Sequence, residues 1–115
     1  MNQLLQRVRA GLPVEFAEVQ AVIAAEYHYH PTAFHNGIGA RQVVNAAGEN
    51  EGSCRLLAFA KMQGLTQAQT LALFGHYYRD EVLGDPGGSS HANIRAFMAD
   101  GWAGVVFEAP ALTPR

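Results

Sequence analysis

The chain has 115 residues and a mass of 12.4 kDa, with 49% hydrophobic residues, 16% charged residues and a formal net charge of −2. This length and composition predict one compact domain over residues 1–115 and exclude extensive disorder. The small negative charge argues against nucleic acid and anionic membranes as partners, because both attract clustered Lys and Arg.

Two amphipathic helices are predicted at the start of the chain. Leu4, Val8 and Leu12 recur every four residues, which places them on one helical face. Pro13 suits the first turn of a second helix, because its missing N–H would have no partner there. We expect this second helix to run to about Glu26.

The next part of the chain changes from a helical to an extended pattern. Residues alternate from Tyr27 to Phe34, and Pro31 prevents a helix there. A turn begins at Asn36, and from there to Gly52 the sequence is rich in glycine and has no helical period. This predicts a long loop. Long loops are uncommon in small domains and are often functional, so a site is first expected here.

Further helices are predicted in the second half of the chain. A broad apolar face follows Ser53, which we expect to cap a central helix that ends at Gly64. Thr66 and Gln69 form a capping box for the next helix. The remaining predicted elements are the end of that helix near Gly75, a short helix from His76 to Leu83, a last helix capped by Ser89 or Ser90 and ending at Gly101, and an apolar strand at Val105–Phe107.

Taken together, these elements predict a mainly α fold. We expect a single compact domain of about six short helices with at most a small two-stranded β hairpin. That hairpin would pair residues 27–34 with residues 105–107.

Several polar and aromatic motifs occur in a fixed order along nearly the whole chain. They are Pro31-Thr32-Ala33-Phe34 with Asn36-Gly37, Asn50-Glu51-Gly52-Ser53-Cys54, Phe74-Gly75 with Tyr77-Tyr78-Arg79-Asp80, and His91 with Asn93-Ile94-Arg95 and Phe97. In these motifs and their order the sequence resembles the HopJ type III effector family. The resemblance implies a small bacterial protein of unestablished biochemical activity, from a family in which some members are injected into plant hosts by type III secretion.

The helix start at residues 50–53 has two interpretations. Asn50, Glu51 and Ser53 could simply satisfy the free N–H groups of the first turn, which is the interpretation we favour. The same N–H groups could instead bind an anion, and the guanidinium of Arg79 or Arg95 could add a bidentate contact to it. The acidic side chain of Glu51 argues against the anion.

We predict that the polar motif residues form one network, because a chain with few charges must pair them. The predicted cluster holds Asn50, Glu51, Arg79, His91, Asn93 and Arg95, and Arg79 is expected to pair with Glu49, Glu51 or an acid of its own helix. The full set of candidate binding residues is Asn36, Asn50, Glu51, Ser53, Tyr78, Arg79, His91, Asn93 and Arg95.

An enzymatic function is the alternative. Cys54 in a first helical turn could be a nucleophile with His91 as base, which would give a thiol-dependent hydrolase or transferase. Asn93 could orient the base, and Glu51 is a further catalytic candidate. A single cysteine followed by apolar residues is more often an inert core thiol, so the prediction leans away from an enzyme.

Metal binding is considered for three histidines. His28 and His30 lie on one face of the extended segment, and His35 is nearby. No acidic residue follows before Glu49 to complete a mixed site. We therefore predict no metal and no cofactor.

The sequence also bears on location and partners. Cys54 cannot form an internal disulfide, and no apolar stretch is long enough for a membrane span or a Sec signal. We expect a binding or effector module in the bacterial cytoplasm, or secreted into a host cell by a type III system. Its partner would be an unidentified protein, such as a host protein, or a small molecule.

Overall fold

A computed structural model describes all residues, 1–115. The elements in chain order are α1 (Asn2–Arg9), α2 (Phe16–Glu26), β1 (Tyr27–Tyr29), β2 (Phe34–Asn36), the 3-10 turn η1 (Gly39–Arg41), β3 (Val43–Asn45), α3 (Glu51–Met62), α4 (Gln67–Ala72), the π-helix η2 (Tyr77–Val82), α5 (Ala92–Asp100), the 3-10 turn η3 (Gly101–Gly104), β4 (Val106–Phe107) and β5 (Leu112–Pro114).

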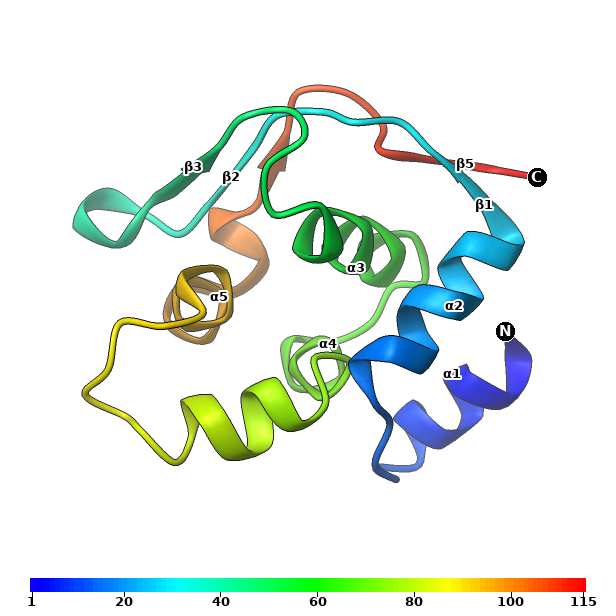
Figure 1. The fold of residues 1–115 in the computed structure, drawn as a ribbon, viewed down its shortest axis with the longest axis horizontal. Helices are drawn as coiled ribbons and strands as arrows, with labels where there is room; N and C mark the ends of the chain where they lie inside the picture. Colours follow the sequence, from blue (N-terminus) through cyan, green and yellow to red (C-terminus); the bar gives the residue numbers. More distant parts are fainter.

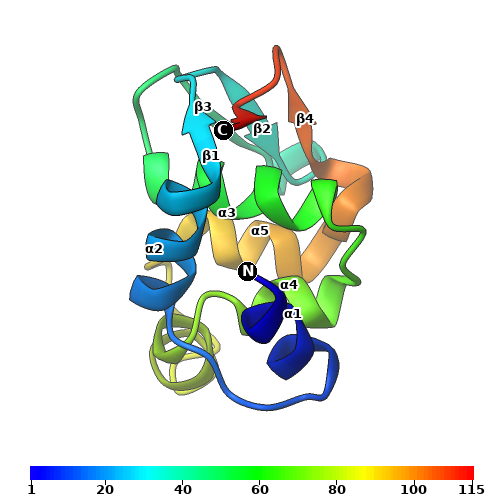
Figure 2. The ribbon, with the colours of Figure 1, turned by 90° about the vertical axis from the view of Figure 1, so that its right-hand side faces the viewer.

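The strands lie along one side of a group of helices. In Figure 1 the strands run along the upper edge, with α3 beneath them, α2 and α1 on one flank and α5 on the other. The side view in Figure 2 shows the same order, with α3 between the strands and α4. Six consecutive or near-consecutive residues of α3 are buried, among them Cys54, Leu57 and Phe59. The predicted central position of this helix is confirmed.

The predicted fold class is wrong. Helices hold 52% of the residues and strands 12%, and the five strands form two small antiparallel sheets instead of one hairpin. The domain is therefore a mixed α/β domain. The alternation from Tyr27 to Phe34 spans parts of two separate strands, β1 and β2, and β3 and β5, with three residues each, are too short to show a pattern of their own.

The register of the sheets shows which part of the predicted pairing holds. Phe34 pairs with Phe107 in the sheet of order β3-β2-β4, so the end of the segment 27–34 does meet residues 105–107. The start of that segment pairs elsewhere, with Tyr27 opposite Pro114 in a second sheet of β1 and β5. The predicted loop 37–52 also contains β3, with Asn36 opposite Val43.

A close backbone approach holds the three-stranded sheet to the end of α5. A Cβ on Gly104 would lie 2.7 Å from the backbone nitrogen of Gly37, and Gly37 itself has φ +93°. Only glycine gives both the free φ and the space for this contact. The contact fixes the first turn after β2 against the segment that follows α5.

The helix ends agree with the sequence in part. The Thr66–Gln69 capping box is present, with both reciprocal hydrogen bonds. The helices α3 and α5 begin after Asn50 and His91, so neither Ser53 nor Ser89 or Ser90 is the cap residue. None of the helices combines the length and the apolar composition of a membrane span.

Candidate functional site

Two helices begin in the same unusual way. Asn50 before α3 has φ 49° and His91 before α5 has φ 53°, and these are the only residues other than glycine with positive φ. Neither side chain caps its helix. The N–H groups of residues 51–53 and 92–94 therefore have no acceptor within the protein. Such groups are donors available for a ligand, and they carry the positive end of the helix dipole.

Both helix starts open into one cavity of about 380 Å³. Its polar wall comes from the two helix starts, and three aromatic side chains form its apolar wall. The lining residues are Asn50, Gly52 and Ser53 from α3, His91, Ala92, Asn93 and Ile94 from α5, and Phe16, Phe74 and Tyr77. Apolar walls with a few convergent polar groups are typical of small-ligand sites.

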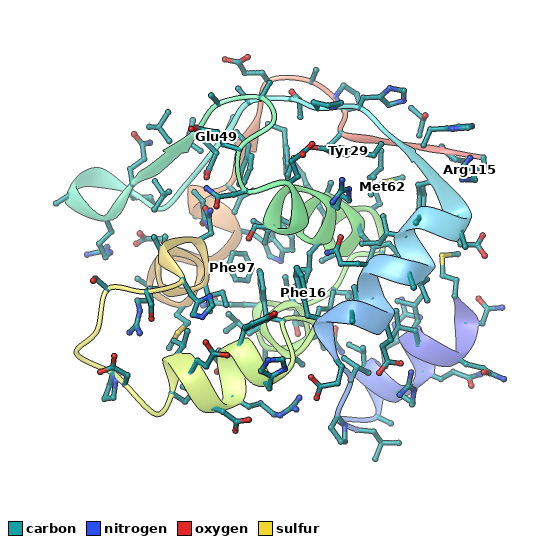
Figure 3. The ribbon with its side chains drawn as sticks, viewed as in Figure 1. Phe16, Tyr29, Glu49, Met62, Phe97 and Arg115 are labelled. Atoms are coloured by element: carbon teal, nitrogen blue, oxygen red, sulfur yellow. The ribbon has the colours of Figure 1, made fainter.

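The aromatic wall is built around Phe16 at the start of α2. Its ring stacks on Phe74 with centroids 6.2 Å apart and meets Tyr77 edge-on at 5.4 Å. Figure 3 shows Phe16 pointing into the molecule below α3. Gly75 allows this approach, because a Cβ there would lie 2.9 Å from the backbone nitrogen of Phe16.

Four asparagines hold the polar wall in place. Asn45 and Asn93 exchange two side-chain hydrogen bonds, of 3.1 and 3.0 Å. Asn50 donates to the Asn45 side-chain oxygen at 2.7 Å, and Asn36 donates to the Asn93 carbonyl at 2.7 Å. The network ties β2 and β3 to the starts of α3 and α5. Because side-chain amides do not titrate, the hydrogen bonds of this network do not depend on the protonation of its members.

Three of the four asparagines are buried, and their hydrogen-bonding groups are almost fully satisfied. Asn36 and Asn45 are 0% and 1% exposed, and Asn93 is 6% exposed. Buried amides are costly unless they are hydrogen-bonded, so the three buried side chains favour one relative position of the two helix starts, and Asn50 adds a further bond to Asn45. The Oδ1 atom of Asn36 is the one buried oxygen of the four asparagines without a partner.

A chain of charged side chains runs along the rim of the cavity. His91 Nε2 lies 2.9 Å from Glu81 Oε1, and the other oxygen of Glu81 lies 3.7 Å from His76. His76 also contacts Glu15 at 3.0 Å, and Glu15 pairs with Arg79. The side chains in this chain are between 28% and 47% exposed, so the pairs are screened by water and contribute orientation more than stability.

The environment of Glu15 shifts its titration. A hydrogen bond from His76, followed by one from Arg79, lowers the pKa of Glu15 to about 2. The carboxylate of Glu15 is therefore ionised across the physiological range, and it also receives the backbone N–H of His76. This holds the start of η2 next to Phe16.

The predicted binding residues fall into two groups. Asn50, Ser53, His91 and Asn93 line the cavity, and Asn36 lies behind it in the asparagine network. The other four do not line it: Glu51, Tyr78, Arg79 and Arg95. The single network predicted for the motif residues is therefore only partly present.

The arginines of the motifs have other partners than predicted. Arg79 pairs with Glu15 and donates to the Val14 carbonyl, instead of pairing with Glu49, Glu51 or an acid of its own helix. Arg95 donates to the carbonyls of Ser90 and Asp85, which orders the loop before α5. Glu51 forms no ion pair.

The geometry gives the thiol candidate no support. Cys54 is 1% exposed, and its Sγ lies 3.9 Å from the Thr32 carbonyl. Desolvation by burial raises the pKa of Cys54, so the thiolate is disfavoured. His91 contacts Glu81 and the Tyr77 ring, and it forms no hydrogen bond with the thiol.

The three histidines considered for a metal have separate partners. His28 lies next to Arg115, His30 next to Thr113 and His35 next to Gln42. No group of three His, Cys, Asp or Glu side chains is placed to hold a metal ion.

Sequence reasoning missed the aromatic wall and two polar groups. Phe16 has the periodic spacing of an apolar helix face, Phe74 belongs to a motif but was given no role, and Tyr77 lines the cavity in place of the predicted Tyr78. Asn45 lies in the segment predicted as a loop, and Glu81 belongs to none of the quoted motifs, so neither was named as a site residue. The segment from His76 to Leu83 was predicted as an ordinary short helix, and the structure forms a π-helix there at Tyr77–Val82.

Comparisons with known proteins agree with the motifs. The sequence model of the family described as HopJ type III effector protein matches residues 1–112. The crystal structure of VPA0580, a protein of unknown function, is similar over 100% of this chain and 93% of that chain, with a TM-score of 0.93 and 42% sequence identity. No curated protein matches the chain.

Proposed function

Because the chain belongs to the HopJ type III effector family, we propose that it acts inside a host cell as a binding module. The binding site is the cavity between the starts of α3 and α5. Its ligand is an acceptor-rich group attached to an apolar ring, present on a small molecule or on a side chain of a host protein. The family description supports the location, and the cavity supports the binding.

One observation carries the proposal: a cavity of about 380 Å³ has donors on one wall and aromatic rings on the other. The free N–H groups of residues 51–53 and 92–94 match an oxyanion such as a carboxylate or a phosphate. Phe16 and Tyr77 match a flat apolar group. Glu51, which would oppose an anion, does not line the cavity.

Binding fits this arrangement better than catalysis. The asparagine network makes the site rigid, and rigid donors lower the cost of ordering on binding. No nucleophile is activated in the cavity, because Ser53 has no hydrogen bond to His91 and Cys54 is buried outside it.

The test is an amide NMR titration with benzoate and phenyl phosphate, each of which joins a ring to an oxyanion. We expect the largest shifts at the amides of Gly52, Ser53 and Asn93. Benzyl alcohol is the uncharged control and should bind at least tenfold more weakly. Shifts spread over the whole surface, or equal binding of benzyl alcohol, would refute the proposal.

A further inference from the structure

A second cationic feature lies away from this cavity. Eight residues are Lys or Arg, and ion pairs form only at Arg7, Arg41 and Arg79. Two of the remaining arginines, Arg55 and Arg115, line one groove of about 450 Å³. In a chain with a net charge of −2, two arginines without an acidic partner in the same groove are available to a ligand.

The first guanidinium is held by a ring. Arg55 Cζ lies 4.2 Å from the centroid of the Tyr29 ring, and Arg55 has no hydrogen bond or ion pair. Stacking fixes the plane of a guanidinium and leaves its N–H edges free. Arg55 is thus positioned in advance, with its donors unused.

The second guanidinium is held by the backbone and by a histidine. Arg115 Nε donates to the Ala24 carbonyl at 2.9 Å, and one of its terminal nitrogens lies 3.3 Å from His28 Nδ1. Its other terminal nitrogen has no partner. Neither contact involves a carboxylate side chain, and Arg115 forms no ion pair with an Asp or Glu.

The groove also has an apolar lining. Ala21, Ala24 and Tyr27 line it together with the two arginines. Figure 3 shows Tyr29, where Arg55 stacks, set apart from Arg115 along this side of the molecule. The two guanidiniums therefore suit two separate anionic groups with an apolar spacer.

The nearby acids leave both arginines free. Glu51 lies one turn before Arg55 on α3, and the Glu26 carbonyl accepts the backbone N–H of Arg115. Neither carboxylate forms an ion pair with either arginine. An incoming carboxylate would thus not need to displace one already in place.

We propose that this groove binds an extended acidic segment of a partner protein. One carboxylate of the segment pairs with Arg55 and a second with Arg115, and an apolar residue between them packs on Ala21 and Ala24. Charge-assisted bonds to guanidinium forks give the specificity. This surface is separate from the cavity at α3 and α5, so either site can be tested without the other.

The test uses labelled peptides in which two glutamates flank one, two or three apolar residues. Binding is measured by fluorescence polarisation and mapped by amide NMR. We expect at least one spacing to bind, with shifts at Ala24, Tyr29 and Arg55, and its glutamine analogue to bind at least tenfold more weakly. Inorganic phosphate should also bind more weakly, because it reaches only one arginine.

Variants assign the effect to the two arginines. Arg55→Gln and Arg115→Gln should each weaken binding about tenfold, equal to about 1.4 kcal/mol. Arg9→Gln is the matched control, because Arg9 is exposed, forms no ion pair and only contacts the Gln63 carbonyl; it should leave the affinity unchanged. The proposal would be overturned if none of the three peptides binds. It would also be overturned if Arg9→Gln weakens binding as much as Arg55→Gln does.

Discussion

The asparagine pair behind the cavity gives the sharpest stability prediction. Asn45 and Asn93 exchange two buried hydrogen bonds. Asn93→Ala removes both and leaves Asn45 Nδ2 with only two contacts of 3.4 Å, to the carbonyls of Phe34 and Val43. The stranded Asn45 Nδ2 costs about 1–3 kcal/mol, and the lost bond from Asn93 to Asn45 Oδ1, which still accepts from Asn50, costs about 1 kcal/mol more. We therefore expect Asn93→Ala to lower the free energy of unfolding by about 2–4 kcal/mol.

A double-mutant cycle isolates the pair from the rest of the network. Asn45→Ala should cost a similar amount, since it also removes the acceptor of Asn50. The double variant should then cost about 2 kcal/mol less than the two single variants added together, because the pair is lost only once. The assay is urea denaturation followed by circular dichroism, with exposed Asn2→Ala as control. Additivity within about 0.5 kcal/mol would refute the reasoning.

Three further predictions concern the thiol, the rim and a helix start. Cys54 in the folded protein should react with iodoacetamide much more slowly than in denatured protein, and His91→Ala should leave this rate unchanged. Rapid labelling that becomes slower in His91→Ala would instead support Cys54 as a nucleophile. Glu15 has a folded pKa of about 2, below its usual 4.5, so its contribution is present above about pH 4.5 and is lost as the pH falls toward 2. Glu15→Gln should therefore be less stable than the parent at pH 7, and the difference between their unfolding midpoints should become smaller as the pH falls. A difference that does not change with pH would contradict this prediction. His91→Gly should be more stable than His91→Ala by about 1 kcal/mol, because alanine is strained at φ 53°, and equal midpoints in urea would show that no strain exists.

The helical part of the fold could be predicted from the sequence because its signals are local. The capping box at Thr66 and the broad apolar face of α3 each lie within a few residues. The strands were predicted less completely, because their partners are distant in the sequence: the pairing of Phe34 with Phe107 was expected, and the pairing of Tyr27 with Pro114 was not. Strands of two or three residues gain their stability from such pairings and not from their own pattern.

The candidate site was predictable to a similar extent. The polar residues Asn50, His91 and Asn93 stood in recognisable motifs and do meet at one place. The prediction that the charged motif residues meet in one cluster was wrong for Arg79. This arginine pairs with Glu15, which is 64 residues away, and no local rule selects among distant acids. The aromatic wall was not predicted for another reason. Phe16 has the periodic position of a core residue, so nothing in the sequence marks it as lining a cavity.

The central claim is that the cavity between α3 and α5 is the binding site, and filling it is the most direct test. Ala92 lines the cavity and is exposed, so Ala92→Phe should occupy the space without disturbing the core. Ala99→Phe, also exposed and on the same helix, is the matched control. Calorimetric titration with phenyl phosphate should show at least a tenfold loss of affinity for Ala92→Phe and none for Ala99→Phe. Unchanged binding to Ala92→Phe, with its fold intact by circular dichroism, would contradict the account.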